Sequence, residues 1–289
     1  MFDQVDSYHR PRSIREAIRL LQAGRSRARI VAGGTDLVAQ ADPSIRSLVD
    51  ITQLGLSYIR KVGKSWVIGT TTTMARVEDS KDICELASGI LAKAAASCGS
   101  VQLRNMATLG GNLANASPAA DTAVPLLVLD ASVVLEGATK RRTLPLMAFF
   151  SAPGKTALGK ELLVEVQVPV PSRGGRWGWS FQKLGRTECD ISIVSAAAGL
   201  QLDARGTCKS VRIALGAVAP TPMRAVGAEA ILAGQKLTAG LIAQVREQVA
   251  REVSPIGDVR APAEYRREMA QVLVERVLRD CAQMAGVTL

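Results

Sequence analysis

The order of the apolar patterns along the 289 residues predicts an α+β fold in two parts, and not a single doubly wound sheet. Helical and strand patterns alternate in the first part, whereas in the second part a small sheet gives way to helices. Between them lies the polar, Gly-rich segment PSRGGRWG at residues 171–178, a composition typical of a joint between domains. We therefore predict a first domain over residues 1–175 and a second over residues 176–289.

Local signals predict the elements of the first domain. A capping box of Ser13 and Glu16 starts a helix, which Gly24 ends. Further helical patterns lie at residues 79–99 and 122–130, and short apolar runs predict strands at residues 28–32, 47–51, 66–70, 132–136 and 161–169.

The second domain begins with sheet patterns and ends with helices. Residues 195–218 read as two strands around a turn at residues 203–206. After PTPMR at residues 220–224, helical periodicity continues to the end of the chain, and the longest helix starts near Pro262.

The composition narrows the class of protein. The net charge of +10 and the pI of about 9.7 suit an anionic cofactor, an acidic partner, anionic lipid or nucleic acid. No long basic run or nucleic-acid module is present, and aromatic residues make up only 3%, which argues against base stacking as the main task. A non-enzymatic module that binds nucleic acid or another anion is therefore the weakest alternative, and we expect no nucleic-acid partner.

Cysteine and histidine usage argues against a metal site in this chain. The five cysteines are far apart and lack both the CxxC pair and the spacing of a plant-type iron–sulfur site, which favours free thiols in a reducing compartment. The single histidine, His9, nearly excludes a histidine-based metal site or a Ser-His-Asp triad. No apolar run approaches the roughly 20 residues of a membrane span. We expect a cytoplasmic protein without a membrane partner.

The segment IVAGGTDLV contains the first glycine pair, directly after a predicted strand. Two glycines let the chain turn sharply, and consecutive N–H groups that point one way bind anions. Thr35 adds a hydroxyl donor, whereas Asp36 would repel a phosphate and is expected to bond to local N–H groups. The motif is neither GxGxxG nor a P-loop, so it is not specific for an anion site. An ordinary turn also explains the same residues.

The segment ATLGGNLANASPAAD contains a second glycine pair and is expected to be a loop. Thr108, Asn112 and Asn115 offer polar side chains, and Asp121 suits a sugar hydroxyl better than a phosphate. A loop whose asparagines satisfy its own backbone explains the segment equally well. Two such glycine–threonine segments in one domain, however, suit a dinucleotide with a pyrophosphate at its centre.

VAGGTDL and RNMATLGGNLANASPAAD together resemble the two flavin-binding signatures of the FAD-binding (medium) subunits of molybdenum hydroxylases. This xanthine dehydrogenase and carbon monoxide dehydrogenase medium-subunit family also includes nicotinate dehydrogenase. FQKLGRTECDISIV resembles the lysine-bearing strand of its second domain, and GAVAPTPMRA and SPIGDVRAPAEYRRE resemble its C-terminal signatures. The resemblance implies an FAD-binding domain of the PCMH or vanillyl-alcohol-oxidase type, with two α+β lobes, followed by a small antiparallel sheet plus helices.

The resemblance also implies a role for each matching residue. Residues 32–38 would wrap the pyrophosphate, and residues 108–112 would bind phosphates and flank the flavin. Asp121 would bond to a ribose or ribityl hydroxyl, and Lys183 would lie near the polar edge of the isoalloxazine and stabilise the reduced flavin. The full implied set of cofactor-binding residues is Ala32, Gly33, Gly34, Thr35, Asp36, Leu37, Val38, Gly99, Thr108, Leu109, Gly110, Gly111, Asn112, Asp121, Leu163 and Lys183.

Cys98 stands where relatives of the animal type carry an aromatic residue, and we expect it to be a small buried hydrophobe. No catalytic residue is expected in this chain. Some relatives carry an extra iron–sulfur cluster in an insertion, of which the cysteine spacing here gives no sign.

The function that the resemblance implies is electron transfer within a heteromeric molybdenum hydroxylase. A large molybdopterin-binding subunit would hydroxylate the substrate, and a small subunit with two [2Fe-2S] clusters would relay electrons to FAD. The flavin would pass them to NAD+ or another acceptor, and the implied assembly is a dimer of heterotrimers. The main alternative is a stand-alone FAD-dependent oxidoreductase of the same fold, which would need a proton donor or base at the flavin ring.

Overall fold

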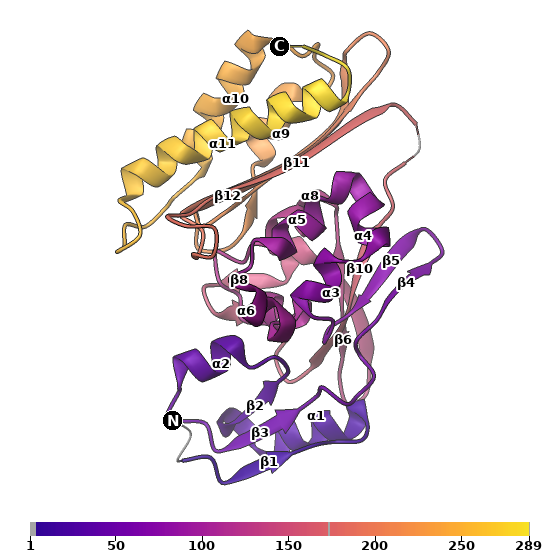
Figure 1. The fold of residues 1–289 in the computed structure, drawn as a ribbon, viewed down its shortest axis with the longest axis vertical. Coiled ribbons are helices and arrows are strands. Elements are labelled where there is room, and N and C mark those ends of the chain that lie inside the picture. The colour runs from indigo at the N-terminus through magenta and orange to yellow at the C-terminus, as the bar shows by residue number, and fades with distance from the viewer. Residues whose placement is uncertain (1–3, 173, 289) are drawn as a thin grey trace.

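Three of the four sheets organise the described chain from one end of the molecule to the other, and helices cover each of these three (Figure 1). The computed structural model describes residues 4–172 and 174–288. The first sheet is parallel, with the order β1 (Ser7–His9), β3 (Ser47–Asp50) and β2 (Ala28–Val31). Helix α1 (Ile14–Ala23) packs on it, and the Ser13 hydroxyl accepts a hydrogen bond from the Glu16 amide, as the capping box predicts.

The second sheet is antiparallel and forms the middle of the molecule. Its order is β4 (Ile59–Val62), β5 (Ser65–Gly69), β10 (Leu162–Pro169), β6 (Ser132–Glu136) and β7 (Arg141–Pro145). Short helices cover it: α3 (Met74–Glu78), α4 (Lys81–Glu85), α5 (Ile90–Ala96), α6 (Val101–Met106), α7 (Leu109–Ala114) and α8 (Ala123–Val128). All six residues of α8 are buried, because this helix lies in the core that joins the second sheet to the third.

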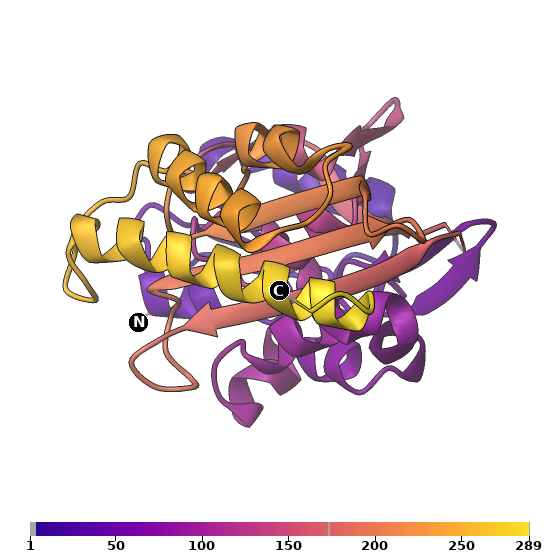
Figure 2. The ribbon, with the colours of Figure 1, turned by 90° about the horizontal axis from the view of Figure 1, so that it is seen from above.

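The third sheet is antiparallel, with the order β11 (Arg176–Leu184), β12 (Val194–Leu202), β13 (Cys208–Gly216) and β14 (Met223–Arg224). Its outer face carries α9 (Val226–Leu232), α10 (Ala239–Glu252) and α11 (Ala263–Met284), and Figure 2 shows α11 running along the strands. The helix comes very close to β11, because a Cβ atom added to Gly178 would lie 1.9 Å from the carbonyl oxygen of Cys281.

The structure confirms the α+β class and most of the predicted strands, and it corrects three expectations. The sequence did not predict α3, α6, β4 or β7. The helix predicted over residues 79–99 is interrupted where Ala87 and Ser88 adopt positive φ values of 49° and 56°. Both glycine segments, expected to be loops, contain helices: α2 (Thr35–Gln40) and α7.

The predicted division at residues 175 and 176 stays a prediction. Within residues 4–172 and 174–288, no helix is long and apolar enough to cross a membrane.

Candidate functional site

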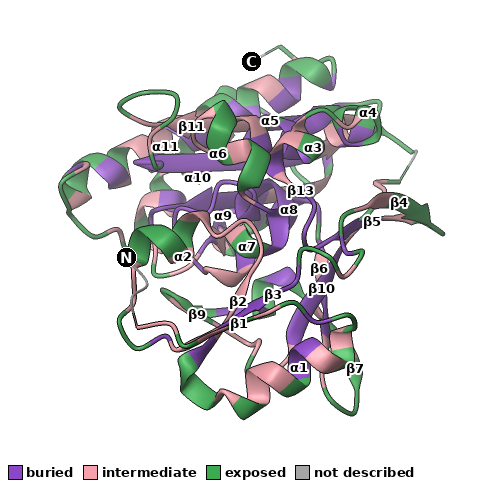
Figure 3. Cartoon of the chain, turned by 60° about the horizontal axis from the view of Figure 1, so that its bottom comes forward, coloured by how far each residue is buried: buried purple, intermediate pink, exposed green. Residues whose placement is uncertain are grey.

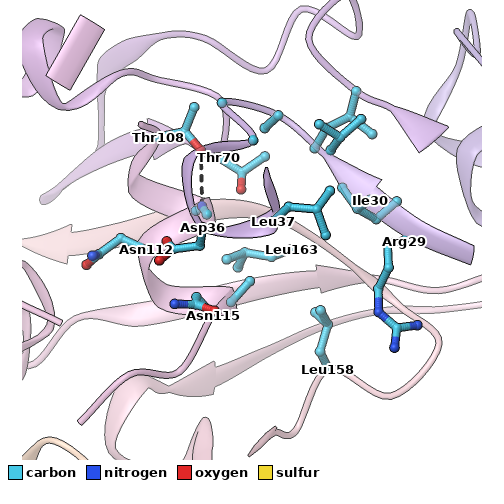
Figure 4. Close-up of a pocket in the computed structure, with 18 of the residues that line it drawn as sticks. Arg29, Ile30, Asp36, Leu37, Thr70, Thr108, Asn112, Asn115, Leu158 and Leu163 are labelled. Atoms are coloured by element: carbon cyan, nitrogen blue, oxygen red, sulfur yellow. Dashed lines mark hydrogen bonds between the residues drawn. The ribbon is translucent and has the colours of Figure 1, made fainter. Parts of the chain in front are cut away.

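One large cavity, of about 820 Å³, opens between the first two sheets, and its size falls within the range of small-molecule and cofactor sites. Strand β2 and helix α2 line one wall, and α7 with the start of β10 lines another. The turn between β8 (Phe150–Ala152) and β9 (Lys155–Thr156), together with residues 158–160, closes a further side. Both glycine segments therefore border the same cavity (Figure 4).

The first glycine pair combines a sharp turn with a close backbone contact. Gly34 has a φ of 70°, the left-handed conformation that glycine adopts without strain, and it precedes α2 without any side-chain cap. The first amides of α2 are thus left for an anionic ligand. Gly33 has a different task, because a Cβ atom there would lie 2.0 Å from the carbonyl oxygen of Met106. The first glycine thus makes room for the end of α6, and it also borders the cavity.

Asp36 does not bond to local N–H groups, which corrects the expectation from the sequence. Its side chain lies in the first turn of α2 at the cavity and accepts no hydrogen bond from the described part of the chain. Desolvation by the surrounding atoms raises the pKa of its carboxyl, although much of the residue remains exposed. A phosphate bound at the start of α2 would therefore lie close to this carboxylate, and the two negative charges would repel each other.

The second glycine pair lies inside a capped helix, and its amides are already bonded. The Leu109 amide donates to the carbonyl of Thr72, and the Gly110 amide to that of Thr70, each at 2.9 Å. The Gly111 amide donates to the Thr108 hydroxyl at 3.1 Å, the bond drawn in Figure 4. The expected cradle of free amides is therefore absent from this segment as described. Gly110 is needed because a Cβ atom would meet the Thr70 hydroxyl oxygen at 1.6 Å.

Two asparagine side chains of this segment line the cavity with a donor still available. The Oδ1 atom of Asn112 accepts from the Thr122 hydroxyl at 2.6 Å, and that of Asn115 accepts from Gln40 at 3.0 Å. Their Nδ2 groups have no partner in residues 4–172 and 174–288, and both side chains are drawn in Figure 4. Ser117 also lines the cavity, where its hydroxyl accepts from the Ala119 amide.

Asp121 and Lys183 form a buried ion pair that does not line the cavity. The Nζ atom of Lys183 lies 2.8 Å from Oδ2 of Asp121, and both side chains are 8% exposed. Lys183 also donates to the Ser97 carbonyl at 2.7 Å, and the Ser192 hydroxyl donates to Oδ1 of Asp121. Burial raises the pKa of Asp121, and Lys183 acts in the opposite direction. The pair is held together from three distant parts of the chain.

Cys98 separates this ion pair from the cavity. Its Sγ atom lies 3.9 Å from Oδ2 of Asp121, and the residue is part of the cavity wall. Burial, and then the Asp121 charge, raise the pKa of the Cys98 thiol, which therefore stays protonated at neutral pH. We expected a small buried hydrophobe, whereas Cys98 is only partly buried because one side of it borders the cavity.

Eleven of the sixteen predicted residues line the cavity: Ala32, Gly33, Gly34, Thr35, Asp36, Leu37, Thr108, Gly110, Gly111, Asn112 and Leu163. The other five do not: Val38, Gly99, Leu109, Asp121 and Lys183. Whether each of the sixteen contacts FAD stays a prediction. Sequence reasoning missed Arg29, Thr70 and Leu158, which also line the cavity. Only Thr70 had a signal, because it begins a run of four threonines, residues 70–73, at the end of a predicted strand.

Comparison with known proteins now identifies the family. The model of the FAD binding domain in molybdopterin dehydrogenase matches residues 2–171, and that of the CO dehydrogenase flavoprotein C-terminal domain matches residues 179–281. The chain belongs to the family of FAD-binding subunits of molybdenum hydroxylases. It is thus an oxidoreductase subunit with an FAD-binding domain and a C-terminal domain, as the resemblance implied.

Its relatives are similar over nearly their whole length. The xanthine dehydrogenase FAD-binding subunit of Escherichia coli O157:H7 is 33% identical over 99% of each chain. The carbon monoxide dehydrogenase medium chain of Hydrogenophaga pseudoflava is 34% identical over 94% of this chain and 95% of its own. Among solved structures, a Cu,Mo-CO dehydrogenase chain superposes with a TM-score of 0.91 at 31% identity, over 97% of this chain and 99% of that one.

Proposed function

We propose that this subunit takes electrons from [2Fe-2S] clusters of a small partner subunit and passes them through FAD to NAD+ or another acceptor. A large molybdopterin-binding subunit would oxidise the substrate. The observation that carries the proposal is the chemistry of the cavity wall. Its ionisable side chains, within the described part of the chain, are Arg25, Arg29, Asp36, Cys98 and Lys160.

None of these side chains suits acid–base catalysis on a substrate held at the flavin ring. Asp36 lies on α2, at the end proposed for the pyrophosphate, and the Cys98 thiol is held protonated by burial. Arginine and lysine carry fixed charge at neutral pH. The chemistry of the wall thus favours a subunit that only binds a flavin. It argues against the stand-alone alternative, in which the subunit also transforms an organic substrate.

Different residues of the cavity wall would hold the pyrophosphate and the sugar chain of FAD. The uncapped first turn of α2 and the Thr35 hydroxyl would bind the pyrophosphate. The free Nδ2 groups of Asn112 and Asn115 would donate to phosphate or ribityl oxygens. Leu37 and Leu163 would pack against apolar parts of the cofactor. Bound FAD supplies the electron and hydride chemistry, and the protein orients it and sets its potential.

The ion pair behind Cys98 gives Lys183 a role that differs from that of a lone cation. Asp121 pairs with the lysine, so the two charges would oppose each other in their effect on a flavin bound in the cavity. Lys183→Met should therefore lower the flavin midpoint potential, and Asp121→Asn should raise it. Potentiometric titration of the purified complex measures both shifts. If the two substitutions shift the potential in the same direction, or not at all, the ion pair does not tune the flavin.

Electron transfer from a partner is tested by comparing the isolated subunit with the native complex. We expect the isolated, yellow subunit to be reduced by dithionite but not by the organic substrate of the complex. In the complex, rapid mixing with that substrate should bleach the iron–sulfur absorbance before or together with the flavin absorbance. Turnover of an organic substrate by the isolated subunit would favour the stand-alone alternative.

The proposal also covers the cellular location of the subunit and its assembly with partner subunits. All five cysteines are free thiols, which supports a reducing, cytoplasmic location. Relatives named as medium chains imply larger and smaller partner chains, and we propose the same for this subunit, assembled as a dimer of heterotrimers. The mass of the native complex tests this stoichiometry.

A further inference from the structure

One turn of the cavity wall is held at both ends by a single side chain. The turn covers residues 158–161 and is closed by a hydrogen bond of 2.9 Å from the Glu161 amide to the Leu158 carbonyl. Leu158, which is labelled in Figure 4, lines the cavity together with Gly159 and Lys160. Gly159 has a φ of 56°, a left-handed conformation that suits a tight turn. We call residues 158–161 the wall turn.

The side chain that holds both ends of the wall turn is that of Arg142. Its Nε atom donates to a carboxylate oxygen of Glu161 at 2.9 Å, and its Nη2 atom donates to the Ala157 carbonyl at 2.7 Å. A guanidinium group has five donors in a planar fork, so it can bind a carboxylate and a carbonyl at the same time. Ala157 directly precedes the turn and Glu161 is its last residue, so one side chain fixes the two ends relative to each other.

Few other contacts keep the wall turn in place. None of its residues is buried, although Ala157 and Leu158 pack partly against the core. Two further hydrogen bonds support it, from the Ala157 amide to the Phe149 carbonyl and from the Leu158 amide to the Thr156 hydroxyl. A segment with little buried apolar surface opens locally at a low cost in free energy. The position of the turn therefore depends strongly on Arg142.

Arg142 reaches the wall turn from the edge of the second sheet. It lies on β7, which Figure 3 shows in the colours of exposed and half-buried residues. Its side chain is 38% exposed and that of Glu161 is 15% exposed, so water can compete for this contact. The preceding residue, Arg141, points to the opposite face of the sheet, where it pairs with Glu165 and Glu136. Only one of these two neighbouring arginines is thus joined to the cavity wall.

The wall turn carries positive charge to the cavity. Lys160 is exposed and forms no ion pair within residues 4–172 and 174–288. The other charged side chains of the described wall are Arg25, Arg29 and Asp36, so Lys160 is one of three cations against one carboxylate. This balance favours an anionic ligand such as a dinucleotide. If the turn moved outward, the wall would lose both this cation and the apolar side chain of Leu158.

We propose that Arg142 is a positioning residue for the cofactor, which holds the wall turn against the cavity and thereby slows the release of bound FAD. The inference rests on the proposed function, because that function places FAD in this cavity. It requires no particular position of the flavin ring and no contact with a partner subunit. Retention of a ligand of this size depends on how completely the cavity walls enclose it. A turn that opens readily would let FAD leave on that side.

The release of FAD from the native complex tests this role. The complex is purified through a tag on this subunit and diluted, and the rising fluorescence of free FAD gives the release rate. Arg142→Met removes the hydrogen bonds and keeps an apolar stem. Glu161→Gln is a milder variant, since it removes the charge and keeps the shape of the side chain. Arg141→Met is the matched control, because it breaks an ion pair made from the same strand on the other face of the sheet. The melting temperature of each variant is measured separately.

We expect Arg142→Met to release FAD roughly tenfold faster than the wild type, because hydrogen bonds to a charged group are lost at both ends of the turn. Glu161→Gln should accelerate release by a smaller factor. Arg141→Met should release FAD at the wild-type rate even if its melting temperature falls as far as that of Arg142→Met.

Two results would overturn the role of Arg142. One is a wild-type release rate in both Arg142→Met and Glu161→Gln. The other is an equal acceleration by Arg141→Met, which would trace the effect to a general loss of stability. Neither result bears on electron transfer, because the release of FAD needs no electron donor. A complex that retains FAD but whose iron–sulfur clusters do not reduce it would instead overturn the proposed function and leave the role of Arg142 standing.

Discussion

Lys183→Met should destabilise this subunit far more than the loss of an ordinary surface lysine. The substitution leaves the Asp121 carboxylate buried with the Ser192 hydroxyl as its main remaining partner, and the Ser97 carbonyl loses its donor. Removing one partner of a buried ion pair costs about 3–5 kcal/mol. That is a large share of the roughly 5–15 kcal/mol that separates a typical folded domain from its unfolded state.

The pH dependence of the variant has a definite sign. The pKa of Asp121 is already raised by burial, and losing Lys183 raises it further. The folded variant then binds a proton that the unfolded chain releases near pH 4. Its free energy of unfolding should therefore fall as the pH rises from about 4 through the raised pKa. The penalty should be smaller at pH 5 than at pH 8.

Urea unfolding followed by tryptophan fluorescence measures these free energies, in a double-mutant cycle with Asp121→Asn. In the Asp121→Asn background, Lys183→Met should cost much less, because no buried charge is left unpaired. Lys81→Met is the control, since the Lys81–Glu85 pair is exposed and its loss should cost less than about 1 kcal/mol. If Lys183→Met costs no more than Lys81→Met, or costs the same in both backgrounds, the ion pair is not a stabilising unit.

Two further predictions concern close packing and acid stability. Gly33→Ala places a Cβ atom 2.0 Å from the Met106 carbonyl oxygen and should abolish FAD retention. Gly240→Ala is the control, because this glycine faces open space on α10, and it should retain FAD. The measurement is the FAD content per protein. Asp258→Asn should cost about 2 kcal/mol at pH 7, less than a fully buried pair, because Arg266 loses its partner. The pKa of Asp258 is lowered by its arginines, so its contribution is lost as the pH falls below about 4, and thermal unfolding of the variant should be less sensitive to acid there.

The elements that the sequence predicted well depend on nearby residues. The helix after Ser13 needs only its own capping box, and the strands at residues 132–136 and 162–169 need only an apolar run. Helix α7 is different. Its glycines are poor helix formers, and the segment is held by the Thr70 and Thr72 carbonyls, nearly forty residues earlier. No local pattern contains that information.

In the candidate site, too, sequence reasoning found what nearby residues determine and missed what distant residues determine. The glycine pairs and Asp121 were found because their residue types are unusual for a core. The structural roles of these glycines were not predicted, since Gly33 and Gly110 make room for other parts of the chain. Sequence reasoning could name Asp121 and Lys183 but could not pair them across 62 positions. Nor could it separate Leu103 on the surface from Leu109 in the core, because the residues next to each leucine are small or polar.

Helices α2 and α6 meet at the wall of the cavity, and this has a thermodynamic consequence. Helix α2 lines the cavity with Thr35 and Leu37, while α6 touches Gly33 through the Met106 carbonyl. Neither helix contains a buried residue, so under the proposed function a bound FAD and a partner subunit that packs on them would both help to hold them in place. The ligand that binds first bears the free-energy cost of ordering these helices, so the second ligand binds more tightly. This coupling must be reciprocal. FAD should therefore bind more tightly in the complex than in the isolated subunit, and the apo subunit should bind its partner less tightly by the same factor.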